Sequence, residues 1–116
     1  MIILCGHGKY GESIKNSLEM ITGKQTNIYT VDFTEDMSVI DLINQYNERI
    51  TVTKEDVSIY CDIPGGSPAN AALLTKKNSS SVRVFTGLNL SMMLSLVMGE
   101  SIESSLTEAK ESIKEL

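Results

Sequence analysis

Hydrophobic positions along the chain form short apolar runs that alternate with longer amphipathic stretches. Four runs have the length and composition of strands, at residues 1–5, 27–33, 57–61 and 82–86. Other stretches have helical character, either from apolar residues spaced three and four apart or from their alanine and leucine content. They predict helices at 11–22, 37–50, 67–77, 90–99 and 102–113.

Local signals mark where several of these helices begin and end. Gly23 follows the apolar stripe of the first helix and predicts its C-terminal cap. The run Ser38–Asp41 places a serine three residues before an acid, which matches a capping box. Ser67 is expected to cap the third helix, with Pro68 in its first position.

The order of elements predicts an α/β fold. Strands that alternate with helices are joined by right-handed crossovers, which give a mostly parallel sheet with helices on both faces. We expect one doubly wound domain over residues 1–116, with about four strands in the order 2-1-3-4. The tail Ser112–Leu116 fits either the end of the last helix or a short extended segment.

Composition and charge narrow the class of protein. Hydrophobic residues make up 41% of the 116 residues and charged residues 22%, which is typical of a globular chain. The net charge of -5 argues against nucleic-acid binding, which usually needs a basic face. No apolar run reaches the roughly 18 residues that cross a bilayer, and two cysteines make no secreted disulfide framework. We expect a cytoplasmic protein that does not insert into membranes.

The one histidine, His7, follows the first apolar strand between Gly6 and Gly8, and Asp62 follows the third strand. Ligands of open parallel sheets bind beyond the carboxyl ends of the strands, and adjacent strands lie about 4.8 Å apart. The two side chains are therefore expected to share a hydrogen bond. The carboxylate would fix the imidazole tautomer and leave the other ring nitrogen free to attack phosphorus.

The loop after the third strand has the features of a phosphate site. Gly65 and Gly66 allow a ligand to approach the backbone, and the following helix directs its N-terminal amides at the mouth of the site. We expect Gly8, Gly65 and Gly66 to bind phosphate and the Ser67 hydroxyl to contact it. The chain contains no GxxxxGK[ST] run, so this loop is not a nucleotide P-loop.

A metal site is the rival interpretation of the same region. Cys5, His7, Cys61 and Asp62 are residue types that bind zinc, and strand alternation places Cys5 and His7 on one face. The same alternation places Cys61 and Asp62 on opposite faces, and buried cysteine is common as a small apolar residue. We expect neither a metal nor a cofactor.

Three segments resemble a known family. The GHG after the first strand, the run DIPGGSPANAA and the run FTGLNLSMML are similar to the enzyme IIA domain of the mannose-type bacterial sugar phosphotransferase system. The resemblance covers almost the whole chain and implies a phosphotransferase. It implies that His7 takes a phosphoryl group from HPr and passes it to a IIB protein, that Asp62 orients the ring, and that Ser67 lies near the phosphate.

The resemblance also implies partners and shows departures. The phosphate would continue to a sugar entering through a IIC/IID permease. Some relatives form homodimers by exchanging a last short strand, which only Ser112–Leu116 could supply here. Gly6 stands where members often have Ser or Thr, which removes one possible phosphate ligand. Pro64 stands where a bulky apolar residue often precedes the two glycines.

Two alternative functions remain open from the sequence. The first is a non-catalytic regulatory domain of the same fold that senses phosphorylation. The second is a phosphocarrier of the dihydroxyacetone pathway, whose phosphodonor contains a similar domain but whose local pattern fits the GGSP loop less well.

Overall fold

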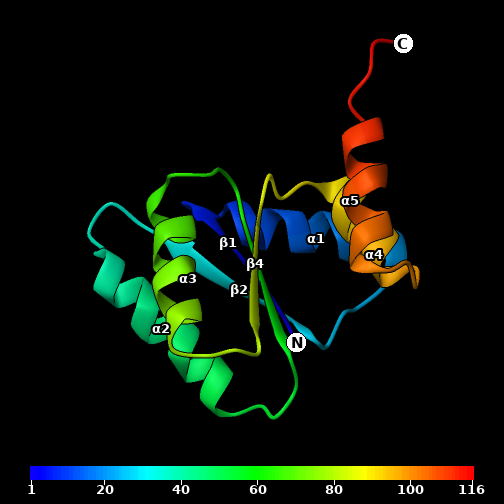
Figure 1. The fold of residues 1–116 in the computed structure, drawn as a ribbon. Coiled ribbons are helices and arrows are strands. Elements are labelled where there is room, and N and C mark those ends of the chain that lie inside the picture. Colours follow the sequence, from blue (N-terminus) through cyan, green and yellow to red (C-terminus); the bar gives the residue numbers. More distant parts are fainter.

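The computed structural model describes residues 1–116 as four strands and five helices (Figure 1). In chain order the elements are β1 (Ile2–His7), α1 (Tyr10–Thr22), β2 (Ile28–Phe33), α2 (Val39–Thr51), β3 (Val57–Cys61), α3 (Ser67–Lys77), β4 (Val82–Thr86), α4 (Leu90–Val97) and α5 (Ile102–Glu111). No helix is long and apolar enough to cross a membrane.

The four strands form one parallel sheet in the order β2-β1-β3-β4, which confirms the expected order. Cys5 of β1 pairs with Val31 of β2 on one side and with Cys61 of β3 on the other. The carboxyl ends of all strands therefore lie at one end of the sheet, at the top of Figure 1. The loops that follow β1 and β3 meet at that end.

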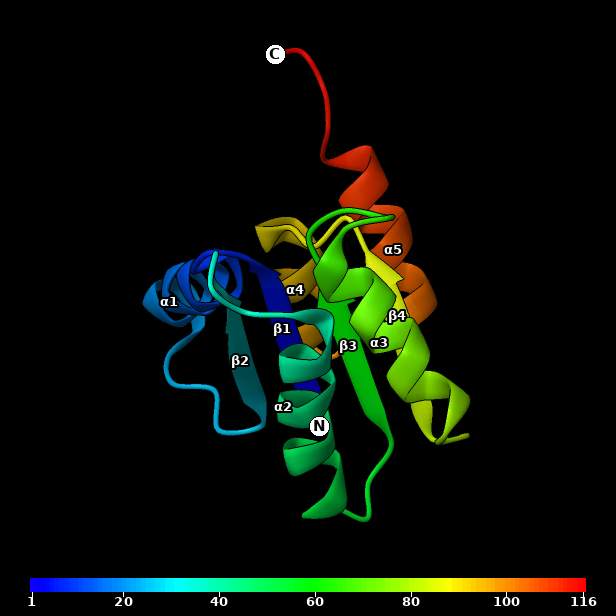
Figure 2. The same ribbon diagram turned by 90° about the vertical axis from the view of Figure 1, so that its left-hand side faces the viewer.

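Helices cover both faces of the sheet, as expected for a doubly wound fold (Figure 2). Strand alternation sends Ile3 and Cys5 to the face under α2 and α3, and sends Leu4 to the face under α1, α4 and α5. The first core contains Ile3, Cys5, Val31, Leu42, Tyr46, Val57, Ile59, Cys61, Ala69, Ala71, Ala72 and Val82. The second contains Leu4, Leu18, Ile28, Tyr60, Leu88, Met92, Met93 and Ala109.

The helix-end signals are correct at two places. Gly23 is the C-cap of α1 and adopts φ +83°, a conformation that glycine tolerates. Ser38 is the N-cap of α2, and its side chain and that of Asp41 make the two reciprocal bonds of a capping box.

The expected cap of α3 is wrong by one residue. Gly66, with extended backbone angles, is the N-cap, so that Ser67 is the first helical residue and Pro68 the second. Proline is tolerated there because first-turn amides have no acceptor within the helix. The Ser67 hydroxyl consequently makes no capping bond.

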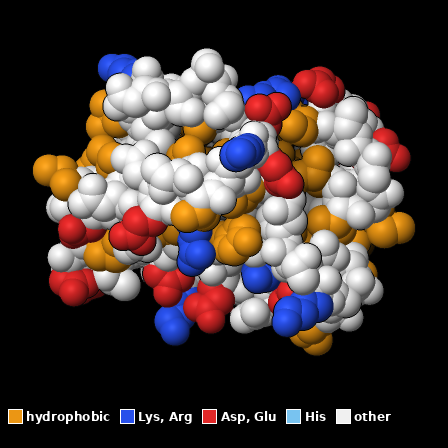
Figure 3. All heavy atoms as spheres, turned by 90° about the horizontal axis from the view of Figure 1, so that it is seen from below, with side chains coloured by type: hydrophobic (Ala, Val, Ile, Leu, Met, Phe, Trp, Pro, Cys, Tyr) orange, Lys and Arg blue, Asp and Glu red, His pale blue; other side chains and the backbone are white.

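Other boundaries differ by a few residues. β1 continues through Gly6 to His7 because both pair with β2, at Asp32 and Phe33. The last helix ends at Glu111, and the tail that follows is extended and projects from the body (Figures 1 and 2). The opposite end of the sheet, seen from below in Figure 3, shows charges of both signs scattered among apolar side chains and no histidine.

Candidate functional site

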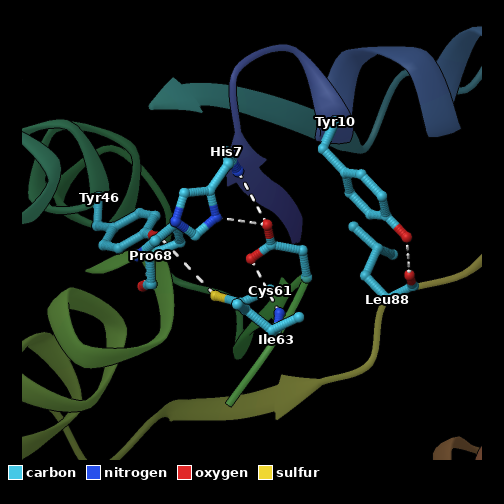
Figure 4. A network of polar contacts seen from close by, with 8 residues as sticks. His7, Tyr10, Tyr46, Cys61, Ile63, Pro68 and Leu88 are labelled. Carbon is cyan, nitrogen blue, oxygen red and sulfur yellow. Dashed lines mark hydrogen bonds and ion pairs between the residues drawn. The ribbon is translucent and has the colours of Figure 1, made fainter. Parts of the chain in front are cut away.

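His7 and Asp62 lie at the carboxyl ends of the neighbouring central strands. His7 is the last residue of β1, and Asp62 directly follows β3. The imidazole Nδ1 lies 2.7 Å from Asp62 Oδ2, and the His7 amide donates to the same oxygen over 2.9 Å (Figure 4). The His7 side chain is 51% exposed and that of Asp62 only 11%. The carboxylate is thus held inside the site while the ring is open to solvent.

The hydrogen bonds at Asp62 favour its ionised form. Burial by itself raises the pKa of this carboxyl, but hydrogen bonds from the His7 amide, the His7 ring and the Ile63 amide outweigh burial and lower its pKa. The Ile63 amide donates to the second oxygen, Oδ1, over 2.9 Å. Asp62 is therefore a carboxylate at neutral pH, fixed through both oxygens.

This carboxylate determines the tautomer of the neutral imidazole. A carboxylate oxygen only accepts hydrogen bonds, so Nδ1 must carry the proton in the 2.7 Å contact. Nε2 then has a free lone pair on a half-exposed ring. The Phe33 ring packs edge-on against the imidazole, with centroids 5.6 Å apart and planes at 81°. His7 is consequently oriented from two sides.

The glycine loop packs directly against the histidine ring. A Cβ at Gly66 would lie 3.0 Å from His7 Cε1 and 3.2 Å from Ile63 Cγ1, so only glycine fits without a shift. Gly65 has φ +80°, and its carbonyl accepts a hydrogen bond of 3.2 Å from the Asn70 side chain. The amides of Gly65 and Gly66 donate no hydrogen bond within the chain. Free donors therefore lie beside the ring.

Gly8 and Ser67 differ in the donors they offer. The Gly8 amide already donates to the Phe33 carbonyl over 2.7 Å, in an antiparallel bridge that turns the chain after His7. Gly8 adopts φ +62°, a backbone conformation that favours glycine, and this accounts for the residue at position 8. Ser67, in contrast, lies in the first turn of α3, and its hydroxyl makes no capping hydrogen bond. The side of the site formed by α3 offers the available donors.

Tyr46 of α2 lies beneath the site at a point where three segments meet. Its hydroxyl donates to the Pro68 carbonyl over 3.0 Å and lies 3.9 Å from Cys61 Sγ (Figure 4). Cys61 precedes Asp62, and Pro68 follows Ser67, so this buried side chain joins the two loops of the site. No local pattern in the sequence points to this role, because Tyr46 belongs to the apolar stripe of its helix.

The two cysteines belong to the core beneath the site. Cys5 and Cys61 are free and buried, and burial raises the pKa of Cys5 to about 11 and that of Cys61 to about 12. No three histidine, cysteine or acidic side chains are grouped so that they could hold a metal ion. The geometry favours the use of His7 and Asp62 as a hydrogen-bonded pair.

The comparison with protein families decides the assignment. Residues 1–114 match the family described as PTS system fructose IIA component, EIIA-man. The chain belongs to the mannose-type enzyme IIA family. Membership places it among the IIA components, the phosphocarriers of the phosphotransferase system, and confirms the resemblance of the three sequence segments.

Individual relatives of this IIA chain agree. It is 29% identical over 109 residues to the PTS system mannose-specific EIIAB component of Escherichia coli (strain K12), covering 92% of the chain and 34% of the relative. It is 31% identical over 100 residues to the sorbose-specific EIIA component of Lacticaseibacillus casei, covering 84% of the chain and 71% of the relative. The chain thus spans about a third of the length of the EIIAB relatives.

A solved structure has the same fold along the whole IIA chain. The phosphotransferase system component EIIA from Streptococcus agalactiae superposes with a TM-score of 0.85 and 29% identity. The match covers 98% of this chain and 95% of that one. The nine elements therefore form the architecture of a IIA domain.

Proposed function

We propose that the chain is a phosphohistidine carrier of the phosphotransferase system. His7 takes a phosphoryl group from HPr and passes it to a IIB protein, which serves sugar uptake through a IIC/IID permease. One observation carries the proposal: a half-exposed imidazole has its Nδ1 proton held by the Asp62 carboxylate at 2.7 Å, which frees Nε2. The fold and the family agree with it.

The chemistry follows from the tautomer. The Nε2 lone pair forms a bond to phosphorus while the bond between phosphorus and the donor's histidine nitrogen breaks, and that electron pair returns to the donor ring. The Nδ1 proton stays in place, so the phosphorylated ring gains positive character. The ionised Asp62 carboxylate offsets that charge. Transfer to IIB reverses the same steps.

The α3 side of the site would bind the phosphoryl oxygens. The free amides of Gly65 and Gly66 and the uncapped hydroxyl of Ser67 lie at the N-terminus of α3, where the helix dipole favours an anion. Phosphoryl transfer needs positioning and charge stabilisation more than covalent help. Gly8 would contribute its amide only after releasing the Phe33 carbonyl.

The test is transfer from phosphorylated HPr, followed by intact mass. Wild-type protein should gain one phosphoryl group that is stable in base and labile in acid. The His7→Gln variant should gain none, and it keeps the size of the side chain. A Tyr29→Phe variant, altered on β2 away from the loops, should be phosphorylated like wild type. Persistence of the label in His7→Gln would refute the role of His7.

Onward transfer separates a carrier from a sensor. Phosphorylated protein mixed with a mannose-type IIB protein should lose its phosphoryl group to IIB. A chain that is phosphorylated but transfers nothing onward would be the regulatory alternative.

We further propose that residues 1–116 act as one IIA domain in the cytoplasm, and that the domain forms a homodimer.

A further inference from the structure

Position 6 is a glycine because its neighbours leave no space for a side chain. A Cβ built on Gly6 would lie 2.8 Å from Tyr10 Cβ and 3.1 Å from both Cγ and Oδ2 of Asp62. The first distance is shorter than real Cβ contacts, and the atom it meets is close to the backbone of α1, where it cannot easily move aside. Tyr10 and Asp62 therefore occupy the room that a side chain at position 6 would need.

Tyr10 reaches from the start of α1 to the loop after β4. Its hydroxyl donates to the Leu88 carbonyl over 2.6 Å (Figure 4). The same loop holds the end of β3, since the Leu88 amide donates to the Cys61 carbonyl over 3.0 Å and the Gly87 amide donates to the Asp62 carbonyl over 3.1 Å. A chain of contacts thus runs from Tyr10 through the Gly87–Leu88 segment to the backbone of Cys61 and Asp62.

We propose that Gly6 and Tyr10 act as a pair in which Tyr10 is a positioning residue for the His7–Asp62 contact. Tyr10 packs over Gly6 beside the Asp62 carboxylate, and its hydroxyl fixes the Gly87–Leu88 segment to which the Asp62 backbone is bonded. This deepens the proposed phosphocarrier function and rests on it. Position 6 has no hydroxyl because the Tyr10 Cβ and the Asp62 carboxylate leave no room for a side chain there.

The first measurement is the tautomer of His7, which needs no phosphorylation. His7 is the only histidine, so its two ring ¹⁵N resonances are unambiguous at a pH where the imidazole is neutral. Wild-type protein should show the Nδ1–H form, and Tyr10→Phe should raise the share of the other tautomer severalfold. The control Tyr29→Phe removes the hydroxyl of a tyrosine on β2 and should leave the resonances unchanged.

The second measurement is a double-mutant cycle on the rate of phosphoryl transfer from HPr. Gly6→Ser should slow transfer because its Cβ has no room beside Tyr10. Tyr10→Gly should slow transfer because the contact with Leu88 is lost. In the double variant the Tyr10 Cβ that a serine Cβ would meet at 2.8 Å is gone, so the loss should be smaller than the product of the single losses by about threefold to tenfold, a usual coupling between touching residues.

The outcomes separate this proposal from the proposed function. Multiplicative effects in the cycle, or a Tyr10→Phe tautomer ratio equal to wild type, would overturn the pairing of Gly6 and Tyr10 while His7 remained the phosphoryl acceptor. If His7 is not phosphorylated at all, the phosphocarrier function fails, and the ¹⁵N measurement still decides whether Tyr10 positions the ring. In that case the double-mutant cycle is measured with the tautomer ratio of His7 instead of the rate of phosphoryl transfer.

Discussion

At the scale of single residues, the protonation of Asp62 controls the site. Its carboxylate accepts from the His7 ring and from two backbone amides, and every one of these bonds favours the ionised form. A neutral side chain at this position would leave both imidazole tautomers available. Asp62→Asn should therefore slow phosphorylation of His7 by roughly 10-fold to 100-fold, by analogy with the loss of carboxylates that orient metal-bound histidines.

The same residue predicts how stability depends on pH. The pKa of Asp62 is lower in the folded protein than its ordinary value of about 3.9, so the folded state binds this proton less readily than the unfolded state. Its stabilisation is complete above that value and is lost as the pH falls through the lowered pKa. In urea titrations at pH 7, the free energy of unfolding should be larger for wild type than for Asp62→Asn. This difference in free energy should shrink below about pH 4. A difference that stayed constant to pH 2 would contradict this assignment.

The two core cysteines should be unreactive in the folded protein. Both thiols are fully buried, and burial raises their pKa values to about 11 and about 12. The thiolate is the reactive form, so Ellman's reagent at pH 8 should label neither residue until the chain is unfolded, when both react. The unfolded chain loses these protons near pH 8.5, so stability should fall as the pH rises above that value. Rapid labelling of native protein would show that the β1–β3 core opens.

At the scale of elements, the loop between β3 and α3 uses its two glycines for different reasons. Gly65 needs glycine for its φ of +80°, whereas Gly66 has ordinary angles and needs it for the close approach of the His7 ring. Gly65→Ala should therefore cost about 1 kcal/mol of stability. Gly66→Ala should cost little stability, because the half-exposed ring can move by a few tenths of an ångström, but it should slow phosphoryl transfer. Equal effects of the two variants on both readouts would refute this division.

Apolar spacing and composition predict where the elements lie, but only some of their ends. The capping box of α2 depends on neighbours in sequence, so the sequence predicts it correctly. β1 continues to His7 because of pairing with Phe33, a residue distant in sequence. The N-cap of α3 is Gly66 and not the predicted Ser67, since the loop must pack against the His7 ring. Contacts of Tyr46 and Tyr10 with distant carbonyls depend on tertiary packing and left no local signal.

At the scale of the whole molecule, one edge of the sheet and the tail remain to be accounted for. β4 pairs only with β3, so its outer backbone edge is free to accept another strand. The residues after α5 extend away from the body, with Ile113 and Leu116 almost fully exposed (Figure 1). Exposed apolar residues on an extended segment suit a strand that a second copy of the chain would pair and cover.

The proposed homodimer therefore predicts a specific effect of the tail. Deletion of residues 112–116 should change the sedimentation of the protein from that of a dimer to that of one chain, while the helical signal in far-ultraviolet circular dichroism is kept because the last helix ends at Glu111. Ile113→Asp should weaken the dimer in the same direction by placing a charge where an apolar contact is expected. Lys114→Asp also introduces a carboxylate, but at a polar position, and serves as the matched control. If the dimer survives the deletion, its interface must lie on another surface. The proposed role of His7 would not be affected by that result.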